Sequence, residues 1–301
     1  MGPGALGASA AGTRGLQTYS LAEPENPTQL DRDDTPGSIA ADIAAFSVIV
    51  TDSKVVLGDG RAGISLFDAS VPENPALAGS IDALDRIAGM DVSGTTVYAC
   101  DDNNGVLIAD VSSSEPREIG RVRFADIGGS DQCYDVLVRD STLYVASAMR
   151  LTVMDISTPS SPTVLGLFEL RAEDRVLALG LSGNYLLMTT SDADFEGRRG
   201  TISRLQVFDV SDASAPTRVW TSEDLGAGND IAIAGDIAFI AGSDLGVYVF
   251  DVYDPSSPFL EGVIKVPGNA AGVAASSGAL YVAQRFGGLS AVHTGPLPTV
   301  R

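Results

Sequence analysis

The sequence contains very few of the residues that most enzyme active sites use. Among 301 residues there is one histidine, His293, and there are two cysteines, Cys100 and Cys133. A Ser-His-Asp or Cys-His arrangement would have to use the histidine at the end of the chain, and two cysteines are too few to define a metal site. We therefore predict no catalytic residue, no metal site and no cofactor, and we favour a protein that is not an enzyme.

Positive charge is also scarce. The chain has 19 basic residues against 39 acidic ones, a formal net charge of −20, and its only lysines are Lys54 and Lys265. A polyanionic surface repels phosphate backbones, so we exclude nucleic acid as a partner. The acidity is compatible with plain solubility or with an acidic face that collects cations or a basic partner.

Long apolar runs are missing as well. No stretch of about 18 apolar residues occurs, so we expect no membrane span. Residues 1–14 are rich in small residues and glycine and lack the pattern of a signal peptide. We expect them to be flexible and residues 15–301 to form a single domain, monomeric by default. The location would be extracytoplasmic or at the cell surface if a leader was removed, and cytoplasmic if Met1 is the native start.

What the chain does contain is a repeat, and no segment shows a sustained helical period. One column of aspartates recurs at intervals from 42 residues (Asp68 to Asp110) to 54 residues (Asp155 to Asp209), with Asp251 as its last full copy. Degenerate copies place Ser20 and His293 in the same column. The matching segments are Gly63–Pro75, Gly105–Pro116, Arg150–Pro162, Arg204–Pro216 and Gly246–Pro258.

Each period contains four strand-like segments rich in β-branched and aromatic residues and separated by turn residues. In the second period they are residues 88–94, 96–101, 105–112 and 118–125. Four short strands in every 40–50 residues are typical of propeller blades, whereas the coils of a solenoid are usually shorter. The sequence therefore predicts an all-β fold, a β-propeller of four-stranded antiparallel blades.

The number of blades depends on the two ends of the chain. From Phe46 onward we count six sets of strands, the last of which ends at His293 without its outer strand. Residues 28–32 could supply that strand and close the ring by joining the termini. We therefore favour six blades, while the extra third-strand copy at residues 16–20 leaves seven as the alternative.

The aspartate column has a structural explanation. An aspartate that ends an exposed strand can accept a hydrogen bond from the backbone N–H two residues further on and so hold the turn. The prolines that follow suit the entry to an edge strand. We predict that Asp68, Asp110, Asp155, Asp209 and Asp251 are structural.

The strands at 106–112 and 247–252, each opened by glycine and followed by proline, resemble LVIVD-repeat proteins. The resemblance covers about residues 15 to 294, and only Ser20 and His293 depart from its aspartate column. It implies a β-propeller, often on bacterial or archaeal cell surfaces, and no particular activity.

A candidate site follows from the topology alone. Loops from the second to the third strand, and from one blade to the next, gather on one face around the channel mouth, and loops on a rigid scaffold often carry binding residues. The within-blade loops contribute Asp101, Asp102, Arg150, Asp192, Asp244 and Gln284. Our predicted ligand-binding residues are Asp85, Arg86, Gln132, Tyr134, Asp174, Arg175, Asn229, Asp230, Asn269 and Arg285.

Two features make this face more specific. The pairs Asp85-Arg86 and Asp174-Arg175 occupy the same place in their blades, and the longest insertion, residues 191–203, also falls there. The alternative is that the pairs bridge adjacent blades and the insertion is a solvated flap.

Three local details are open to more than one interpretation. Cys100 and Cys133 are expected in adjacent blades on the channel face, either as a disulfide, as two buried thiols or as a reactive thiol. Asp101 to Gly105 reads as Asp-Asp-Asn-Asn-Gly, which suits a tight turn better than a calcium site. Trp220 is expected to pack between blades.

These observations predict a non-catalytic binding or scaffolding propeller. Its acidic channel face would be presented to a protein, peptide, glycan or cation. The alternative is an enzyme with a histidine-free site of Asp, Arg, Tyr or Cys at the channel mouth, because propellers support many unrelated activities.

Overall fold

The computed structural model divides the chain into two compact units. One contains Met1–Val145 and Val153–Val164, and the other contains Ala146–Thr152 and Leu165–Arg301. The residues that the structure describes are 6–10, 16–23, 26–33, 45–51, 53–60, 63–83, 85–127, 132–148, 150–170, 175–192, 202–276, 278–284 and 288–293.

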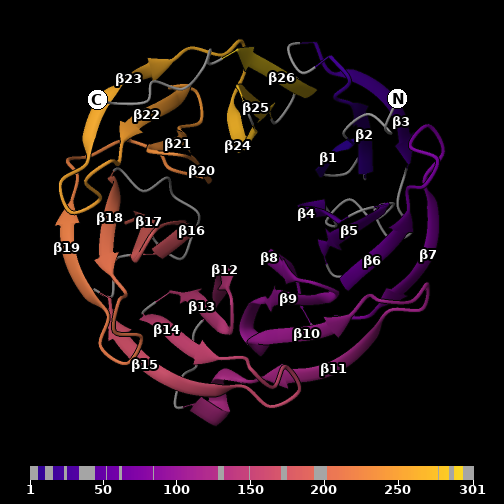
Figure 1. Cartoon of the computed structure of the whole chain (residues 1–301), viewed down its shortest axis with the longest axis horizontal. Helices are drawn as coiled ribbons and strands as arrows, with labels where there is room; N and C mark the ends of the chain where they lie inside the picture. The colour runs from indigo at the N-terminus through magenta and orange to yellow at the C-terminus, as the bar shows by residue number, and fades with distance from the viewer. Residues whose placement is uncertain are drawn as a thin grey trace. The chain divides into compact units, whose positions relative to one another are not determined.

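The described strands form seven antiparallel sheets, and in each sheet the strands follow one another in chain order (Figure 1). We number these sheets blades 1 to 7. Blade 1 is β1 (Leu6–Ala10), β2 (Leu16–Ser20) and β3 (Thr28–Asp33); blade 2 is β4 (Ala45–Thr51), β5 (Lys54–Asp59), β6 (Gly63–Asp68) and β7 (Ala76–Ile81); blade 3 is β8 (Ile87–Ser93), β9 (Thr96–Asp101), β10 (Val106–Asp110) and β11 (Arg117–Val122).

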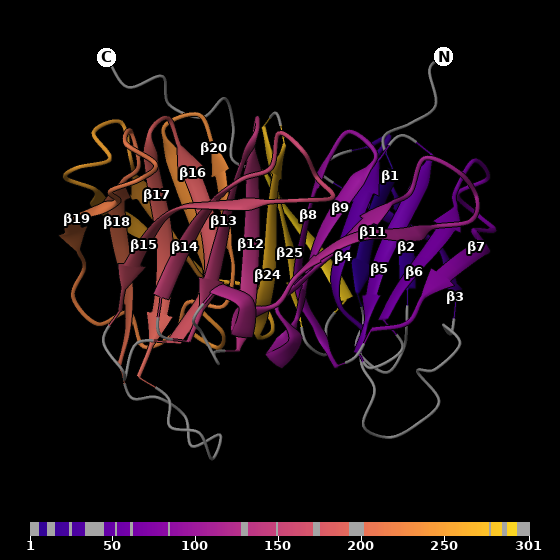
Figure 2. The same cartoon turned by 90° about the horizontal axis from the view of Figure 1, so that it is seen from below.

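The chain continues in the same way. Blade 4, through which the division between the units passes, is β12 (Cys133–Arg139), β13 (Thr142–Ser147), β14 (Arg150–Asp155) and β15 (Thr163–Glu169). Blade 5 is β16 (Arg175–Ser182), β17 (Tyr185–Ser191), β18 (Ser203–Asp209) and β19 (Thr217–Thr221); blade 6 is β20 (Ile231–Ala234), β21 (Ile237–Ala241), β22 (Val247–Asp251) and β23 (Phe259–Ile264); blade 7 is β24 (Ala270–Ser276), β25 (Ala279–Gln284) and β26 (Gly288–His293). Figure 2 shows the strands of one blade, such as β4 to β7 of blade 2, lying side by side.

The fold is therefore a seven-bladed β-propeller with four-stranded blades and three-stranded first and last blades. The preferred count of six blades was wrong, and the alternative of seven is correct. Residues 28–32 do not complete the last blade, because β3 pairs with β2, its neighbour along the chain. Leu6–Ala10, which we expected to be flexible, pairs with β2 as β1, so the first blade begins before the expected boundary at residue 15.

The aspartate column has the structural role that we predicted. Each carboxylate accepts a hydrogen bond of 2.8–2.9 Å from the backbone N–H two residues further on. In blade 1, Ser20 takes the same place, and its hydroxyl oxygen accepts from the N–H of Ala22 at 3.3 Å. The residues that make these bonds are Asp68, Asp110, Asp155, Asp209 and Asp251.

Glycine opens several third strands for a steric reason. Gly105 and Gly246 have φ of 92° and 104°. A Cβ at either position would lie 2.0 Å or 2.3 Å from the carbonyl oxygen of Val122 or Ile264 on the neighbouring outer strand. Only glycine allows this close approach with a positive φ.

The second and third strands of the blades supply most of the core. Residues 97–100 and 106–109 in blade 3 are completely or almost completely buried. Blades also pack on one another, as where Trp220 of β19 meets Phe250 of β22 edge to face, with ring centroids 6.3 Å apart. This contact confirms the expected place of Trp220 between blades. Among the described residues, no helix could span a membrane.

Candidate functional site

The best-defined polar site is the corner between β9 and β10, which we call the blade 3 corner. It comprises Asp85 and Arg86 before β8, the short 3₁₀ turn Asp102–Asn104, and Gln132 and Tyr134 where β12 begins. The turn is closed by a 2.8 Å hydrogen bond from the N–H of Asp101 to the carbonyl oxygen of Gly105. Asp102 has a positive φ of 32°, so this segment does form the tight turn that its sequence favours.

Asp101 anchors the corner from within. It is 0% exposed, and its Oδ2 atom pairs with the guanidinium of Arg121 on β11. Its other oxygen accepts the backbone N–H of Asp85 at 2.7 Å. Arg121 also donates two hydrogen bonds of 3.1 Å to Glu118. A buried carboxylate needs such partners, so this ion pair fixes the turn and the loop before β8.

The pair Asp85-Arg86 turns into this corner. Asp85 accepts hydrogen bonds from the backbone N–H of Arg86 at 2.9 Å and from the side-chain amide of Asn103 at 3.0 Å. The Arg86 guanidinium lies 3.8 Å from the Oδ2 atom of Asp102. In this blade, the Asp-Arg pair therefore links two loops of one corner.

Asp102 is the most unusual group here. Only 8% of its surface is exposed, and its Oδ1 atom is buried without a hydrogen-bond partner. Burial raises the pKa of Asp102, and the negative charges of Asp85 and Asp101 add to this, whereas Arg86 and a hydrogen bond with Gln132 lower it. A buried carboxylate in this setting is costly unless positive groups or hydrogen-bond donors lie close to it.

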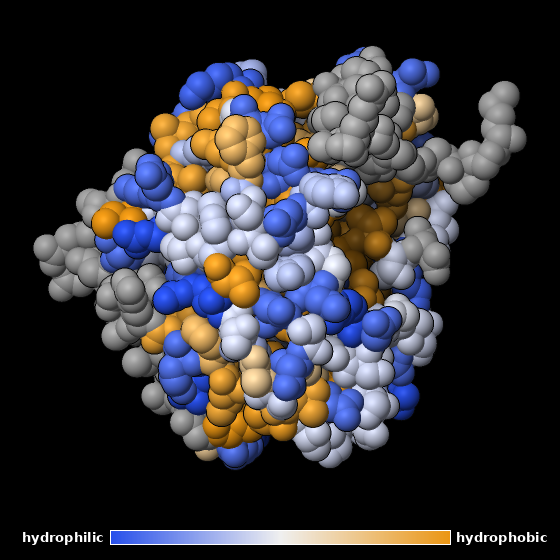
Figure 3. Space-filling model, turned by 60° about the vertical axis from the view of Figure 1, so that its left-hand side comes forward, coloured by the Kyte–Doolittle hydropathy of each residue, from blue (hydrophilic) through white to orange (hydrophobic). Residues whose placement is uncertain are grey.

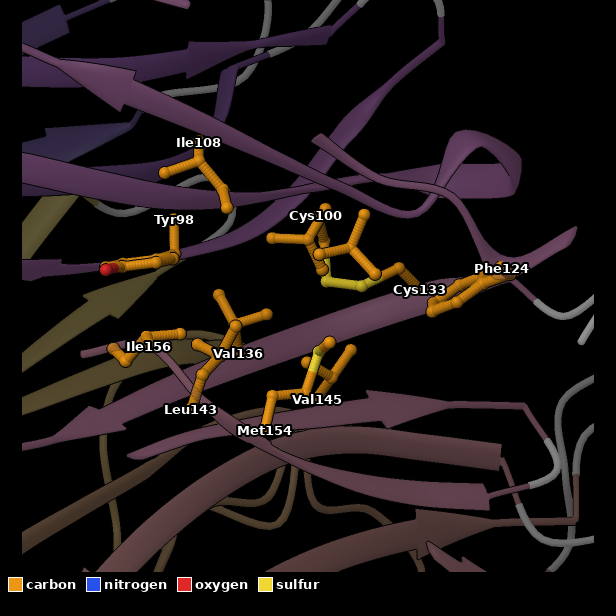
Figure 4. Close-up of a cluster of buried hydrophobic side chains, with 12 residues drawn as sticks. Tyr98, Cys100, Ile108, Phe124, Cys133, Val136, Leu143, Val145, Met154 and Ile156 are labelled. Carbon is orange, nitrogen blue, oxygen red and sulfur yellow. A yellow bond between two sulfur atoms is a disulfide. The ribbon is translucent and has the colours of Figure 1, made fainter. Parts of the chain in front are cut away.

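The next blade contributes a side-chain pair and a cross-link. Gln132, which contacts Asp102, accepts a 2.9 Å hydrogen bond from the Tyr134 hydroxyl. Cys100 at the end of β9 and Cys133 at the start of β12 form a disulfide bond, so of the three interpretations only the disulfide is correct. Figure 4 shows the disulfide among buried apolar side chains such as Phe124 and Val145.

Blade 6 has a corner of the same construction, built from amide and hydroxyl groups and one carboxylate, that of Asp244. The side-chain amide of Asn229 donates hydrogen bonds to the Ser243 hydroxyl at 2.8 Å and to the carbonyl oxygen of Ala270 at 3.0 Å. Asn269 donates to Asp244 at 3.0 Å. We call this the blade 6 corner. It brings together two of the predicted residues, Asn229 and Asn269, without an ion pair among its described residues.

Asp230, also predicted as a ligand, instead links two inner strands. Its oxygens accept the backbone N–H groups of Ile231 at 2.8 Å and of Val273 on β24 at 2.9 Å. Burial raises its pKa to about 6, although both hydrogen bonds lower it. Asp91 makes the same kind of link in the other unit, to the N–H of Val138 at 2.6 Å. Both oxygens of Asp230 are thus occupied within the fold.

The remaining predicted residues are less informative. Arg175 begins β16, whereas Asp174, Arg285 and the insertion residues 193–201 lie outside the described part of the chain. Asp85, Arg86, Gln132 and Tyr134 come together at the blade 3 corner. Sequence reasoning missed Arg121 and Glu118, because nothing in their local pattern shows that Arg121 reaches a buried carboxylate 20 residues away.

The blade 3 corner carries a surplus of negative charge. Four carboxylates, those of Asp85, Asp101, Asp102 and Glu118, face two guanidinium groups, those of Arg86 and Arg121. Within the described residues, no group of three or more His, Cys, Asp or Glu side chains is arranged to hold a metal ion. The surplus of carboxylates at the blade 3 corner favours the binding of hydrogen-bond donors and positive groups over the binding of anions.

Comparisons with known proteins agree with the fold. The family model described as the LVIVD repeat matches residues 88–123, 132–169 and 225–265. No curated protein sequence matches the chain. The Pan2 WD40 domain of Neurospora crassa has a TM-score of 0.69 at 13% identity, over 98% of this chain and 90% of that one.

Two further solved structures are similar. The Cps50 (Swd1) β-propeller domain of Myceliophteria thermophila has a TM-score of 0.69 at 11% identity, covering 95% of this chain and 92% of that one. A chain of the mitotic checkpoint complex has a TM-score of 0.70 at 14% identity, covering 96% of this chain and 83% of that one. At these identities the likeness shows the fold alone.

Proposed function

We propose that this LVIVD-repeat β-propeller is a non-catalytic binding and scaffolding protein that presents the blade 3 corner to a basic protein or peptide. The Pan2 WD40 domain and the Cps50 propeller share its fold, and one similar chain comes from the mitotic checkpoint complex. The net charge of −20 would attract such a partner over a long range.

The observation that carries the proposal is the surplus of negative charge at the blade 3 corner. The corner has two more carboxylates than guanidinium groups. An ammonium or guanidinium group of a partner would balance this charge.

The side chains of the described residues support the alternative, an enzyme, less well than they support a binding protein. The two cysteines are joined in a disulfide, so neither offers a thiolate. The carboxylate with the pKa of about 6, Asp230, already accepts two backbone amides. A raised pKa at such a position is explained by structure alone.

The disulfide also supports a proposal about location. Disulfides persist mainly in oxidising compartments, and Cys100–Cys133 is formed between two blades of the fold. We therefore propose that the protein works outside the cytoplasm or at the cell surface. Thiol labelling of the protein taken directly from its source would test this, because a free-thiol signal would contradict it.

A thermal-shift screen tests the binding site. The probes are a synthetic lysine peptide, calcium, a neutral oligosaccharide and sulfate, each against wild type, Asp85→Asn/Asp102→Asn and, as the matched control in the blade 6 corner, Asp244→Asn. Bound ligand stabilises the folded state by mass action. We expect the lysine peptide to raise Tm in wild type and in the control, and much less in the double variant. An unchanged response of the double variant, or a response to sulfate or sugar alone, would contradict the proposal.

A further inference from the structure

The turn between β22 and β23 exposes two aromatic side chains that the fold does not use. Tyr253 and Phe259 are each 67% exposed, more than any other large apolar side chain among the described residues. The turn leads into β23, the outer strand of blade 6. On the face of the molecule that Figure 3 shows, apolar residues (orange) lie between hydrophilic ones (blue). Exposed aromatic side chains are typical anchors of binding surfaces.

The other copies of this turn show that the aromatic pair is not a requirement of the repeat. The place of Tyr253, whose N–H bonds to the column aspartate, is taken by serine in the four other full copies. The place of Phe259, which pairs with Asp251, is taken by alanine, arginine or threonine. The residues found instead are Ser70, Ser112, Ser157 and Ser211, and Ala76, Arg117 and Thr217.

The segment of the chain that contains this pair carries charge of one sign. From residue 219 to residue 264 the sequence has no lysine, arginine or histidine. Asp254 lies in the turn itself and Glu261 lies on β23, and both are exposed. The eight acidic residues of this stretch are Glu223, Asp224, Asp230, Asp236, Asp244, Asp251, Asp254 and Glu261. The exposed carboxylates of Asp254 and Glu261 repel a second copy of this acidic chain and attract a cation.

The edge strand β23 is poorly suited to the docking of a β-strand from a partner. The pairing of β22 with β23 is shifted between Val249 and Phe250, so that Glu261 lies in a bulge. Comparable shifts interrupt the outer pairings of blades 1, 2, 3 and 5. Bulges and charges on edge strands oppose the docking of another strand, so a partner would have to recognise the side chains of the turn.

We infer that the Tyr253–Phe259 turn is a docking site for an arginine-bearing segment of a basic protein. The guanidinium group stacks on the exposed rings and pairs with the carboxylates of Asp254 or Glu261. Arginine suits this place better than lysine, because its planar group both stacks on aromatic faces and forms two hydrogen bonds to a carboxylate. This site shares no residue with the blade 3 corner. It is a second binding site, in addition to the one in the proposed function.

The repeat itself supplies a safe variant for the test. Tyr253→Ser/Phe259→Thr installs the pair Ser211 and Thr217 that the same turn carries in blade 5, so it should fold normally. Val219→Thr, at an exposed apolar position of β19, is the control. Fluorescence anisotropy with a labelled peptide of three arginines in a glycine–serine background, and with its lysine counterpart, measures the affinity.

We expect the arginine peptide to bind wild type and Val219→Thr more tightly than the lysine peptide does. The double variant should lose about tenfold in affinity for the arginine peptide and lose the preference for arginine, and Glu261→Gln should weaken binding severalfold. Asp85→Asn/Asp102→Asn should keep the arginine preference, which separates this site from the blade 3 corner.

Three results would overturn the inference. One is equal binding of the arginine peptide to wild type and to Tyr253→Ser/Phe259→Thr. Another is that the wild type binds a neutral oligosaccharide and not the arginine peptide, and that Tyr253→Ser/Phe259→Thr abolishes the binding of the oligosaccharide. The last is a concentration-dependent dimer in sedimentation velocity that the double variant abolishes, since the occupant would then be a second copy.

Discussion

The corners of blades 3 and 6 have the same backbone plan and different chemistry. Each begins where the second strand ends, contains a residue with positive φ (Asp102 or Ser243), and closes on a glycine, Gly105 or Gly246, that opens the third strand. In blade 3 the corner holds a buried ion pair and a disulfide. In blade 6 the corner holds side-chain hydrogen bonds from Asn229 and Asn269 to a hydroxyl group, a backbone carbonyl and the carboxylate of Asp244.

The equivalent positions make the difference specific. Val106 pairs with Cys100 in blade 3, and Val247 pairs with Ala241 in blade 6. Cys133 and Ala270 each begin the first strand of the following blade. Because the blade 6 corner forms without an ion pair among its described residues and without a cross-link, this backbone plan alone does not account for the charged groups of blade 3. Arg121 balances the buried carboxylate of Asp101, and we assign a role in binding to the other two aspartates of the corner, Asp85 and Asp102.

The largest expected effect comes from removing the buried counter-charge in blade 3. Arg121→Ala leaves the 0%-exposed Asp101 without its guanidinium partner, and we expect a loss of about 3–5 kcal/mol in the free energy of unfolding. The counterpart in blade 6, Asn229→Ala, removes neutral hydrogen bonds and should cost about 1–2 kcal/mol. Urea denaturation measures both. Equal losses would show that the two corners do not differ in the way described.

The disulfide should rank second. Replacing Cys100 and Cys133 by alanine removes a cross-link between residues 33 apart, and we expect a loss of about 2–4 kcal/mol, measured by denaturation under non-reducing conditions. Alanine already occupies both equivalent positions in blade 6, so the packing should tolerate the change. A loss below about 1 kcal/mol would mean that the cross-link hardly stabilises the fold.

The pH dependence of stability tests the raised pKa of Asp230. Because the folded-state pKa of Asp230 is raised to about 6, its contribution to stability is full below its unfolded pKa near 4 and is lost as pH rises through 6. The loss between pH 4 and pH 7 is at most about 3 kcal/mol, since the side chain is only partly buried. Asp230→Asn should remove this decline in urea titrations at several pH values. A decline of the same size in wild type and variant would assign it to other groups.

The smallest effect is expected at the turn that all full blades share. Asp251→Ala removes the hydrogen bond to the N–H of Tyr253 and should cost about 1 kcal/mol. Asp251→Ser should cost less, because Ser20 makes the same bond at a longer distance in blade 1. Thermal unfolding of the two variants measures the difference. If Asp251→Ser were the less stable of the two, the hydrogen bond would not explain the aspartate column.

The local features of the fold could be predicted from the sequence, because they depend on neighbours in the chain. The bond from each column aspartate to the N–H two residues on is such a feature, and so is the turn at Asp101 to Gly105. The blade count could not be predicted in this way. Residues 28–32 could complete either the first or the last blade, and only the pairing of β3 with β2 decides between them.

The sequence could predict which loops form the candidate site. It could not predict which of their side chains are occupied within the fold. Asp85, Arg86, Gln132 and Tyr134 do meet at one corner, as their places before the first strands indicated. Whether a carboxylate serves the fold or a ligand depends on its partners, however. Asp230 bonds to Val273, which lies 43 residues away in the chain, and no local pattern shows this.

Hydrogen–deuterium exchange with and without the lysine peptide tests the central claim most directly. If the blade 3 corner is the binding surface, residues 85–86 and 101–105 should become protected on addition of the peptide, and the blade 6 corner at residues 242–246 should not change. Asp85→Asn/Asp102→Asn should abolish that protection. Protection at residues 242–246 alone, or protection at 101–105 that persists in the double variant, would contradict the account.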